Sequence, residues 1–84
     1  MKKEFETILV SEIRKAEKVA NKLTGYDNCK VTAYSAKVDK DFPDFIDVTC
    51  EICRDYEEVL NDVVVKINVF MPDRRMSKAY GYNL

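Results

Sequence analysis

The chain contains no histidine among its 84 residues. Histidine is the usual general base near neutral pH and the commonest metal ligand, and Ser-His and Cys-His nucleophile pairs also depend on it. With only two glycines in the whole sequence, glycine-rich phosphate loops are missing as well. We therefore expect a protein that is not an enzyme, with no catalytic residues and no cofactor.

Two glycines and two prolines are too few for a disordered chain, and the 46% hydrophobic content is typical of globular proteins. The length predicts a single domain over residues 1–84, with residues 73–84 as a tail that could be mobile. Three cysteines, an odd number, suit a reducing compartment better than a disulfide framework. Since neither a signal peptide nor an apolar run of membrane-spanning length is visible, we expect a cytoplasmic protein that does not enter a membrane.

The charges are unevenly distributed along the chain, although the net charge is only −1. Residues 1–40 carry a net charge of +3, residues 41–62 carry −7, and residues 63–84 carry +3. The acidic part, together with Asp39 just before it, predicts a negative patch formed by Asp39, Asp41, Asp44, Asp55, Glu57 and Glu58. Nucleic-acid-binding domains are usually basic overall, so a nucleic-acid partner is not expected, although it stays as an alternative. Charge that is segregated along the chain favours a protein partner, which it can orient.

Apolar residues recur with helical spacing early in the chain and predict an amphipathic helix from about Glu4 to Leu23. Gly25 follows as a residue that can end the helix in the left-handed conformation. One carboxylate, Glu12, falls on the apolar side of this helix. A buried carboxylate needs a partner, and we expect Glu12 to reach the rim and pair with Lys15 or a strand-borne basic residue, rather than to be held for a ligand.

Three later segments alternate apolar and polar residues with the period of two that is typical of strands. They run from Cys29 to about Val38, from Phe45 to Arg54, and from Val63 to Met71. The first segment changes phase, and we expect a bulge or bend near Tyr34 and Ser35 to reconcile its halves. The third is a long β-branched run with one charge, which would promote aggregation if it formed a bare edge.

These elements predict an α+β fold (α-β-β-β): one N-terminal amphipathic helix packed on a three-stranded antiparallel sheet, with a tail that could form a short helix around residues 74–80. The expected core is a single cluster of Ile8, Leu9, Ile13, Val48, Ile52, Val65 and Ile67. The third strand would be protected by a central position, by the folded-back tail or by another chain. The basic tail and the acidic residues 39–44 are expected at the same end of the sheet.

Cys50 and Cys53 form a Cys-x-x-Cys pair, but alternation within a strand sends the two thiols to opposite faces, where they cannot share a metal. We therefore expect no metal site, with Cys50 in the core and Cys53 open to alkylating reagents on the other face. The acidic turn of residues 39–44 lacks the glycine and glutamate of a calcium loop and is interpreted as a solvated turn.

The order of one helix followed by three strands resembles that of the double-stranded-RNA-binding domain, and the resemblance covers this order alone. That family continues into a second helix that begins with a Lys-Lys-x-Ala-Lys-type signature for phosphates. The nearest stretch here is RRMSKA at residues 74–79, which keeps neither that spacing nor that helix length. The resemblance implies an RNA-binding module that uses the sheet face and the basic tail, and this is the alternative hypothesis.

The preferred hypothesis is a small non-catalytic protein–protein interaction module, an inhibitor or adaptor that acts by occupying a partner's surface. One helix leaves one face of the sheet open, so contact is expected through that face or through the edge of the third strand. A homodimer formed through the same surfaces is also expected. Candidate interface residues are Tyr34, Glu51, Val64, Lys66, Phe70, Arg74 and Arg75.

Overall fold

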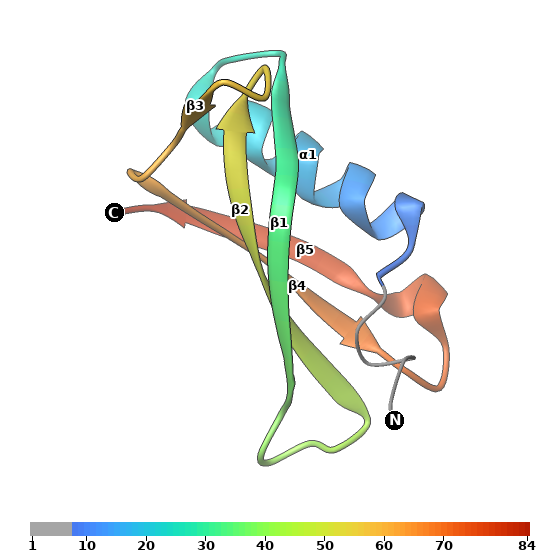
Figure 1. Cartoon of the computed structure of the whole chain (residues 1–84). Helices are drawn as coiled ribbons and strands as arrows, with labels where there is room; N and C mark the ends of the chain where they lie inside the picture. Colours follow the sequence, from blue (N-terminus) through green and yellow to red (C-terminus); the bar gives the residue numbers. More distant parts are fainter. Residues whose placement is uncertain (1–7) are drawn as a thin grey trace.

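The computed structural model describes residues 8–84, which form one helix and one antiparallel sheet (Figure 1). The elements are α1 (Val10–Thr24), β1 (Cys29–Val38), β2 (Phe45–Arg54), β3 (Glu58–Val59), β4 (Val63–Phe70), the 3-10 turn η2 (Arg74–Met76) and β5 (Lys78–Asn83). The strand order is β1-β2-β4-β5, and β3 pairs with the end of β2. The α+β fold is confirmed, but the sheet has five strands, so the expectation of three is wrong.

The tail forms strand β5, which pairs antiparallel with β4. Its sequence, KAYGYN, has no β-branched residue and four residues of types that are depleted in strands, so the composition gives a weak strand signal. The short helix expected around residues 74–80 is only the 3-10 turn η2. Because β4 has β2 on one side and β5 on the other, the third predicted strand has no free edge, and the folded-back tail is the arrangement that protects it.

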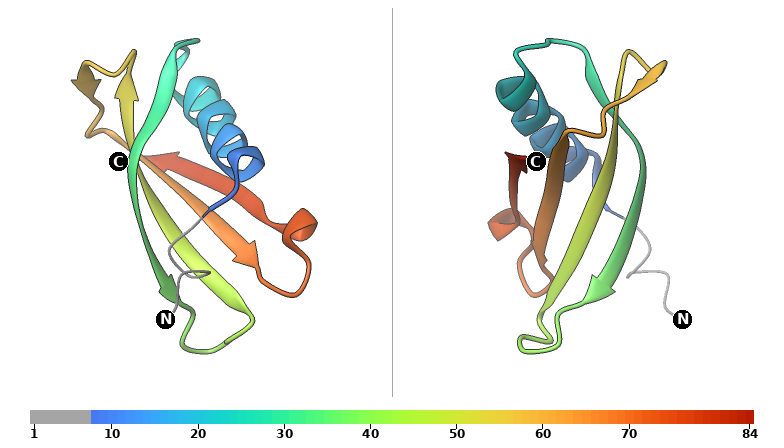
Figure 2. Two further views of the ribbon diagram at one scale, coloured as in Figure 1. Left: turned by 45° about the vertical axis from the view of Figure 1, so that its right-hand side comes forward. Right: turned by 90° about the vertical axis from the view of Figure 1, so that its left-hand side faces the viewer.

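Helix α1 lies over one face of the sheet, and the sheet twists so that β1 and β5 flank the helix (Figure 2). The helix begins at Val10 rather than near Glu4, which lies outside the described residues. Leu9 has extended backbone angles, and its N–H donates to Oε1 of Glu12 at 2.9 Å. Gly25 ends the helix with a φ of 83°, as the sequence predicts.

The core lies between α1 and the sheet and consists of β-branched residues of β2 and β4 packed on small helix residues. Its largest fully buried apolar side chains are Ile67, Val48, Val65 and Val69. Leu9, expected in the core, is 42% exposed because it precedes the first helical turn. Gly81 allows the helix to approach β5, since a Cβ there would lie 2.9 Å from Leu23 Cδ1 and 2.6 Å from a backbone oxygen of β4.

A bulge at Thr32 shifts the register between β1 and β2. Val31 lies opposite Ile52, whereas Ala33 lies opposite Glu51, so the bulge comes earlier than the expected position near residues 34–35. An extra residue reverses the face on which every later side chain of the strand lies. The side chains of β1 after Thr32 therefore lie on the opposite faces of the sheet from those that an uninterrupted alternation would give them.

Cys53 is 5% exposed, so the expectation of an accessible thiol on the open side of β2 is wrong. Thr32 places its Oγ1 3.2 Å from Cys53 Sγ, and Val59 of the short strand β3 pairs with Cys53. Together the bulge and β3 bury a residue that alternation alone places on the solvent side. Cys29 and Cys50 are buried as well, and all three thiols are free.

Candidate functional site

The face of the sheet opposite α1 carries polar and aromatic side chains in rows that cross the strands. The register sets Lys37, Asp47, Asn68 and Lys78 in one row, and Ser35, Thr49, Lys66 and Tyr80 in the next. Within the first row, Asn68 Nδ2 donates to Asp47 Oδ1 at 3.0 Å. Among the described residues no helix covers this face, which we call the open face.

One end of the open face carries an apolar patch, formed by Phe42, Phe45, Phe70 and Met76; we call it the Phe/Met patch. The rings of Phe45 and Phe70 lie 4.9 Å apart between centroids, and Phe42 meets Phe45 edge-on at 6.5 Å. Phe42 and Met76 are 63% and 61% exposed. A hollow of about 290 Å³ opens between Phe45, Phe70 and Met76, with Asn68 and Lys78 at its polar margin.

The turn η2, which carries Met76, is attached to helix α1 by a buried ion pair. Arg74 donates from Nε to Glu12 Oε2 at 2.9 Å and from a terminal nitrogen to Oε1 at 2.7 Å. Glu12 is 1% exposed, so the expectation that it reaches the rim is wrong. Its partner is Arg74 in η2, and not Lys15 or a basic residue on a strand, which the sequence analysis predicted. Burial raises the pKa of Glu12, but the hydrogen bonds from Arg74 and the Leu9 N–H outweigh it and hold the pKa below its usual value of 4.5.

Ser77, directly after η2, is also buried and fixes the turn on both sides. Its carbonyl accepts from Lys15 Nζ at 2.8 Å, and its Oγ accepts from the N–H of Phe70 at 3.2 Å. Helix α1 and strand β4 thus both bond the residue that follows the turn. As a result, Met76 lies next to Phe70 on a turn that is held in place by hydrogen bonds, and not on a flexible loop.

The predicted interface residues are divided among three places. Glu51, Val64, Lys66 and Phe70 belong to the open face. Tyr34 does not, because the bulge sets it opposite Cys50 on the helix side, where its hydroxyl accepts from the Ile8 N–H at 3.3 Å. Arg74 bonds Glu12, while Arg75 bonds Asp73 at 3.0 Å on the surface.

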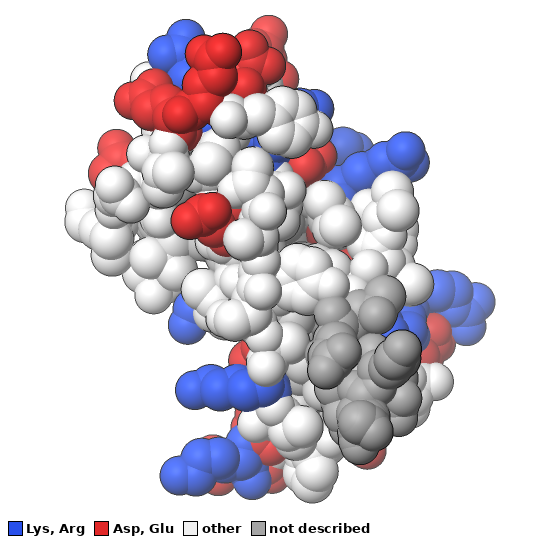
Figure 3. All heavy atoms as spheres, in the orientation of Figure 1, with Lys and Arg blue, Asp and Glu red and all other residues white. Residues whose placement is uncertain are grey.

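The six predicted acidic residues form two groups rather than one patch. Asp39, Asp41 and Asp44 lie in the connection between β1 and β2, whereas Asp55, Glu57 and Glu58 lie in and beside the turn between β2 and β3. The ten residues of β2 separate the groups, and red side chains gather at the top of Figure 3, where Figure 1 places the second turn. The first group shares its end of the sheet with η2, as expected, since the Met71 N–H donates to the Asp44 carbonyl.

The sequence pattern did not identify several residues of the open face. Tyr80 and Tyr82 were missed because β5 was not predicted; both are about half exposed and lie beside Lys66 and Val64. Phe42 and Phe45 are neighbours in the sequence, but only the fold brings Met76 to them and to Phe70. The alternation of large side chains with alanine and glycine in KAYGY, residues 78–82, was the signal that could have placed a strand there.

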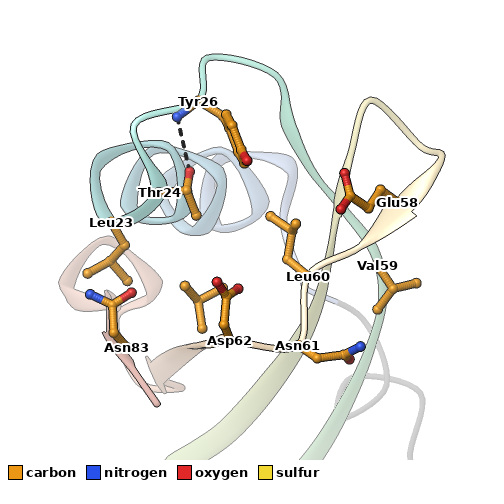
Figure 4. A pocket seen from close by; sticks show the side chains of 10 residues that line it. Leu23, Thr24, Tyr26, Glu58, Val59, Leu60, Asn61, Asp62 and Asn83 are labelled. Carbon is orange, nitrogen blue, oxygen red and sulfur yellow. Dashed lines mark hydrogen bonds between the residues drawn. The ribbon is translucent and has the colours of Figure 1, made fainter.

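A larger hollow of about 530 Å³ lies at the opposite end of the molecule (Figure 4). It is bounded by the end of α1, the link from β3 to β4, and Asn83 of β5. Glu58 and Asp62 contribute carboxylates, and Thr24 Oγ1 accepts from the Tyr26 N–H at 3.2 Å. Its lining exposes more polar than apolar surface, whereas that of the smaller hollow in the Phe/Met patch is mainly apolar, so the smaller hollow is the better site for an apolar anchor.

Among residues 8–84, no three side chains of His, Cys, Asp or Glu come together to hold a metal ion. No helix in the same range is long and apolar enough to cross a membrane. No family model, curated protein or solved structure matches this chain.

Proposed function

We propose that this protein is a small non-catalytic module that binds a partner protein through the open face, with the Phe/Met patch as the anchor point. The observation that carries the proposal is the exposed hollow between Phe45, Phe70 and Met76. Exposed apolar patches of this kind mark binding sites more often than chance, and their aromatic and methionine residues are typical of interface centres. A protruding apolar side chain of the partner fits the hollow.

The polar surroundings of the hollow favour a particular kind of partner. Asn68 and Lys78 line its margin, and both can donate hydrogen bonds to acceptors beside an apolar anchor. Farther along the face, Asp47 and Glu51 disfavour a phosphate backbone but tolerate a protein surface of mixed charge. We therefore expect a folded protein that presents an apolar residue next to carboxylate or carbonyl oxygens.

The proposal is tested by affinity capture with three forms of the chain: wild type, Met76→Asp and Val10→Asp. Met76 and Val10 are 61% and 62% exposed, so the two substitutions add the same charge at matched sites, one on the patch and one on the helix. Wild type and Val10→Asp should retain the same protein after nuclease treatment, and Met76→Asp should lose it. Equal retention by Met76→Asp and Val10→Asp would remove the patch from the interaction.

RNA is the second candidate, favoured by one observation. Tyr80 lies beside Lys66 on the open face, and Tyr82 follows at the next exposed position, so two stacking surfaces lie next to a positive charge. A labelled single-stranded RNA should then bind with an affinity that falls steeply with salt, and Tyr80→Ala should weaken it about 5–100-fold, the effect of losing one stacked base. Retention of a protein after nuclease treatment with no RNA binding would favour the first candidate.

A further inference from the structure

Strand β5 is an edge of the sheet, and its backbone phase can be read from the neighbouring hydrogen bonds. The Leu84 N–H donates to the Asp62 carbonyl at 2.9 Å, which places even-numbered residues of the strand in bonded pairs with β4. Odd-numbered residues then direct their N–H and C=O groups outward. Ala79, Gly81 and Asn83 are the outward-facing residues of β5, and no hydrogen bond to these outward groups is present within residues 8–84.

The two edges of the sheet are treated differently by helix α1. At β1 the outward N–H of Cys29 donates to Asn21 Oδ1 at 2.9 Å, and that of Val31 donates to Glu17 Oε2 at 3.1 Å. Helix side chains thus satisfy two outward N–H groups at the start of the β1 edge, before the bulge. On the β5 side, the one hydrogen bond from a helix side chain within residues 8–84 goes from Lys15 to the carbonyl of Ser77, just before the strand. The outward groups of β5 itself receive none from the helix in this range.

The β5 edge is bordered by positive charge. A shallow groove of about 410 Å³ runs between helix and strand, lined by Lys15, Lys18, Val19, Ser77, Lys78 and Ala79. Residues three and seven apart on a helix share one side, so Lys22 continues the line of Lys15 and Lys18 toward the helix end. No carboxylate belongs to the lining of this groove.

We propose that the β5 edge binds an extended acidic peptide segment, which adds to the sheet antiparallel to β5. Ala79, Gly81 and Asn83 would exchange backbone hydrogen bonds with it, as in other cases of strand addition. Directly opposed residues share a face, so the segment's hydrogen-bonded residues point to the helix side. Carboxylates are expected at these positions, facing Lys15 and Lys18, with apolar residues at the alternate positions beside Tyr80 and Tyr82.

This edge is distinct from the Phe/Met patch, and the proposal does not rest on the function assigned to the open face. A second copy of the chain is the other occupant to consider, because two β5 strands could pair about a twofold axis. That pairing would bring the lysines of two helices toward one another with no acidic residue in the groove to offset them. Charge complementarity thus favours an acidic segment.

The probe is a short fluorescein-labelled peptide of alternating glutamate and valine, titrated with the full-length protein. N-methylation of the glutamate residues removes the amides expected to bond β5, and N-methylation of the valine residues removes those expected to face solvent. The first modification should abolish binding and the second should preserve it. In an amide exchange experiment, the unmodified peptide should protect Ala79, Gly81 and Asn83 in particular.

Two variants and a control complete the test. Lys18→Glu should weaken peptide binding about 5–10-fold, and the same change at exposed Lys40, in the β1–β2 connection, should leave it unchanged. Asn83→Pro removes one outward N–H while keeping the β4 pairing, and should weaken binding about 5-fold.

Several results would overturn the proposal. One is binding of both N-methylated peptides as tightly as the unmodified peptide. Another is binding of a lysine–valine peptide with the same affinity as the glutamate–valine peptide. A third is no binding of the glutamate–valine peptide at millimolar concentration. A dimer in sedimentation that Asn83→Pro converts to monomer would also overturn it, since the edge would then belong to a second copy.

Discussion

The two faces of the sheet differ in what covers them and in what their side chains do. On the helix side, Val48, Val65 and Ile67 are at most 1% exposed and pack against α1. On the open side, Thr49 and Tyr80 reach solvent, and Phe70 contributes to a patch with an exposed hollow. One face therefore carries most of the stability, which leaves the other available for binding at little cost to folding.

The largest stability effect is expected on the helix side. Ile67→Ala removes a fully buried side chain from the centre of the core and should lower the free energy of unfolding by about 4 kcal/mol. Thr49→Ala, on the exposed side of β2, should change it by less than about 0.5 kcal/mol. Urea unfolding followed by circular dichroism measures both, and similar losses at both sites would contradict the difference between the faces.

The next effect concerns the ion pair that connects the helix to the turn η2. Arg74→Ala leaves the carboxylate of Glu12 buried without its main partner and should destabilise the fold by about 3 kcal/mol. Arg75→Ala is the control, because its pair with Asp73 lies on the surface and should matter far less. If the two variants unfolded at the same urea concentration, the Glu12–Arg74 pair would have no special role.

A smaller effect is expected from pH. The pKa of Glu12 is lower in the folded chain than its usual value of 4.5, so its ionised form stabilises the fold at neutral pH. This contribution is present above about pH 4.5 and is lost as the pH falls through the folded pKa. The stability gap between wild type and Glu12→Gln should thus narrow between pH 7 and pH 3 in urea titrations, and a gap that stays constant would contradict it.

The smallest difference is expected between the reactivities of two cysteine thiols on opposite sides of β2. Burial raises the pKa of the Cys50 thiol to about 11, and Cys53 is also buried, beneath Thr32 and β3. Both should therefore react with iodoacetamide at least about 100-fold more slowly than in the unfolded chain, with little difference between them. Mass spectrometry after brief labelling checks this, and rapid modification of Cys53 alone would show that the bulge does not cover it.

The positions of the main strands before residue 73 were predictable from sequence, and the places where tertiary structure intervenes were not. The bounds of β1 and β2 follow from the repeating pattern of residues 29–38 and 45–54. The prediction that Tyr34 belongs to the open face was wrong because a single extra residue, Thr32, reverses the alternation. Strand β5 was missed because its tendency to form a strand comes from pairing with β4 more than from its own composition.

The candidate site was predictable only in part for a similar reason. Val64, Lys66 and Phe70 follow from the alternation within one strand. Met76 and Phe42 lie in irregular segments with no pattern, and they reach Phe70 and Phe45 only after the chain has folded. The pairing of Glu12 with Arg74 spans 62 residues, and no local rule connects two such positions.

The most direct measurement of the central claim is photo-crosslinking of the chain in its native cells. A benzoylphenylalanine residue is placed at position 76, on the Phe/Met patch, or at position 10, which is equally exposed on the helix. Irradiation should give a protein adduct that resists nuclease from position 76 and none from position 10. No adduct at position 76, an adduct that nuclease removes, or the same protein adduct from both positions would contradict binding through the open face.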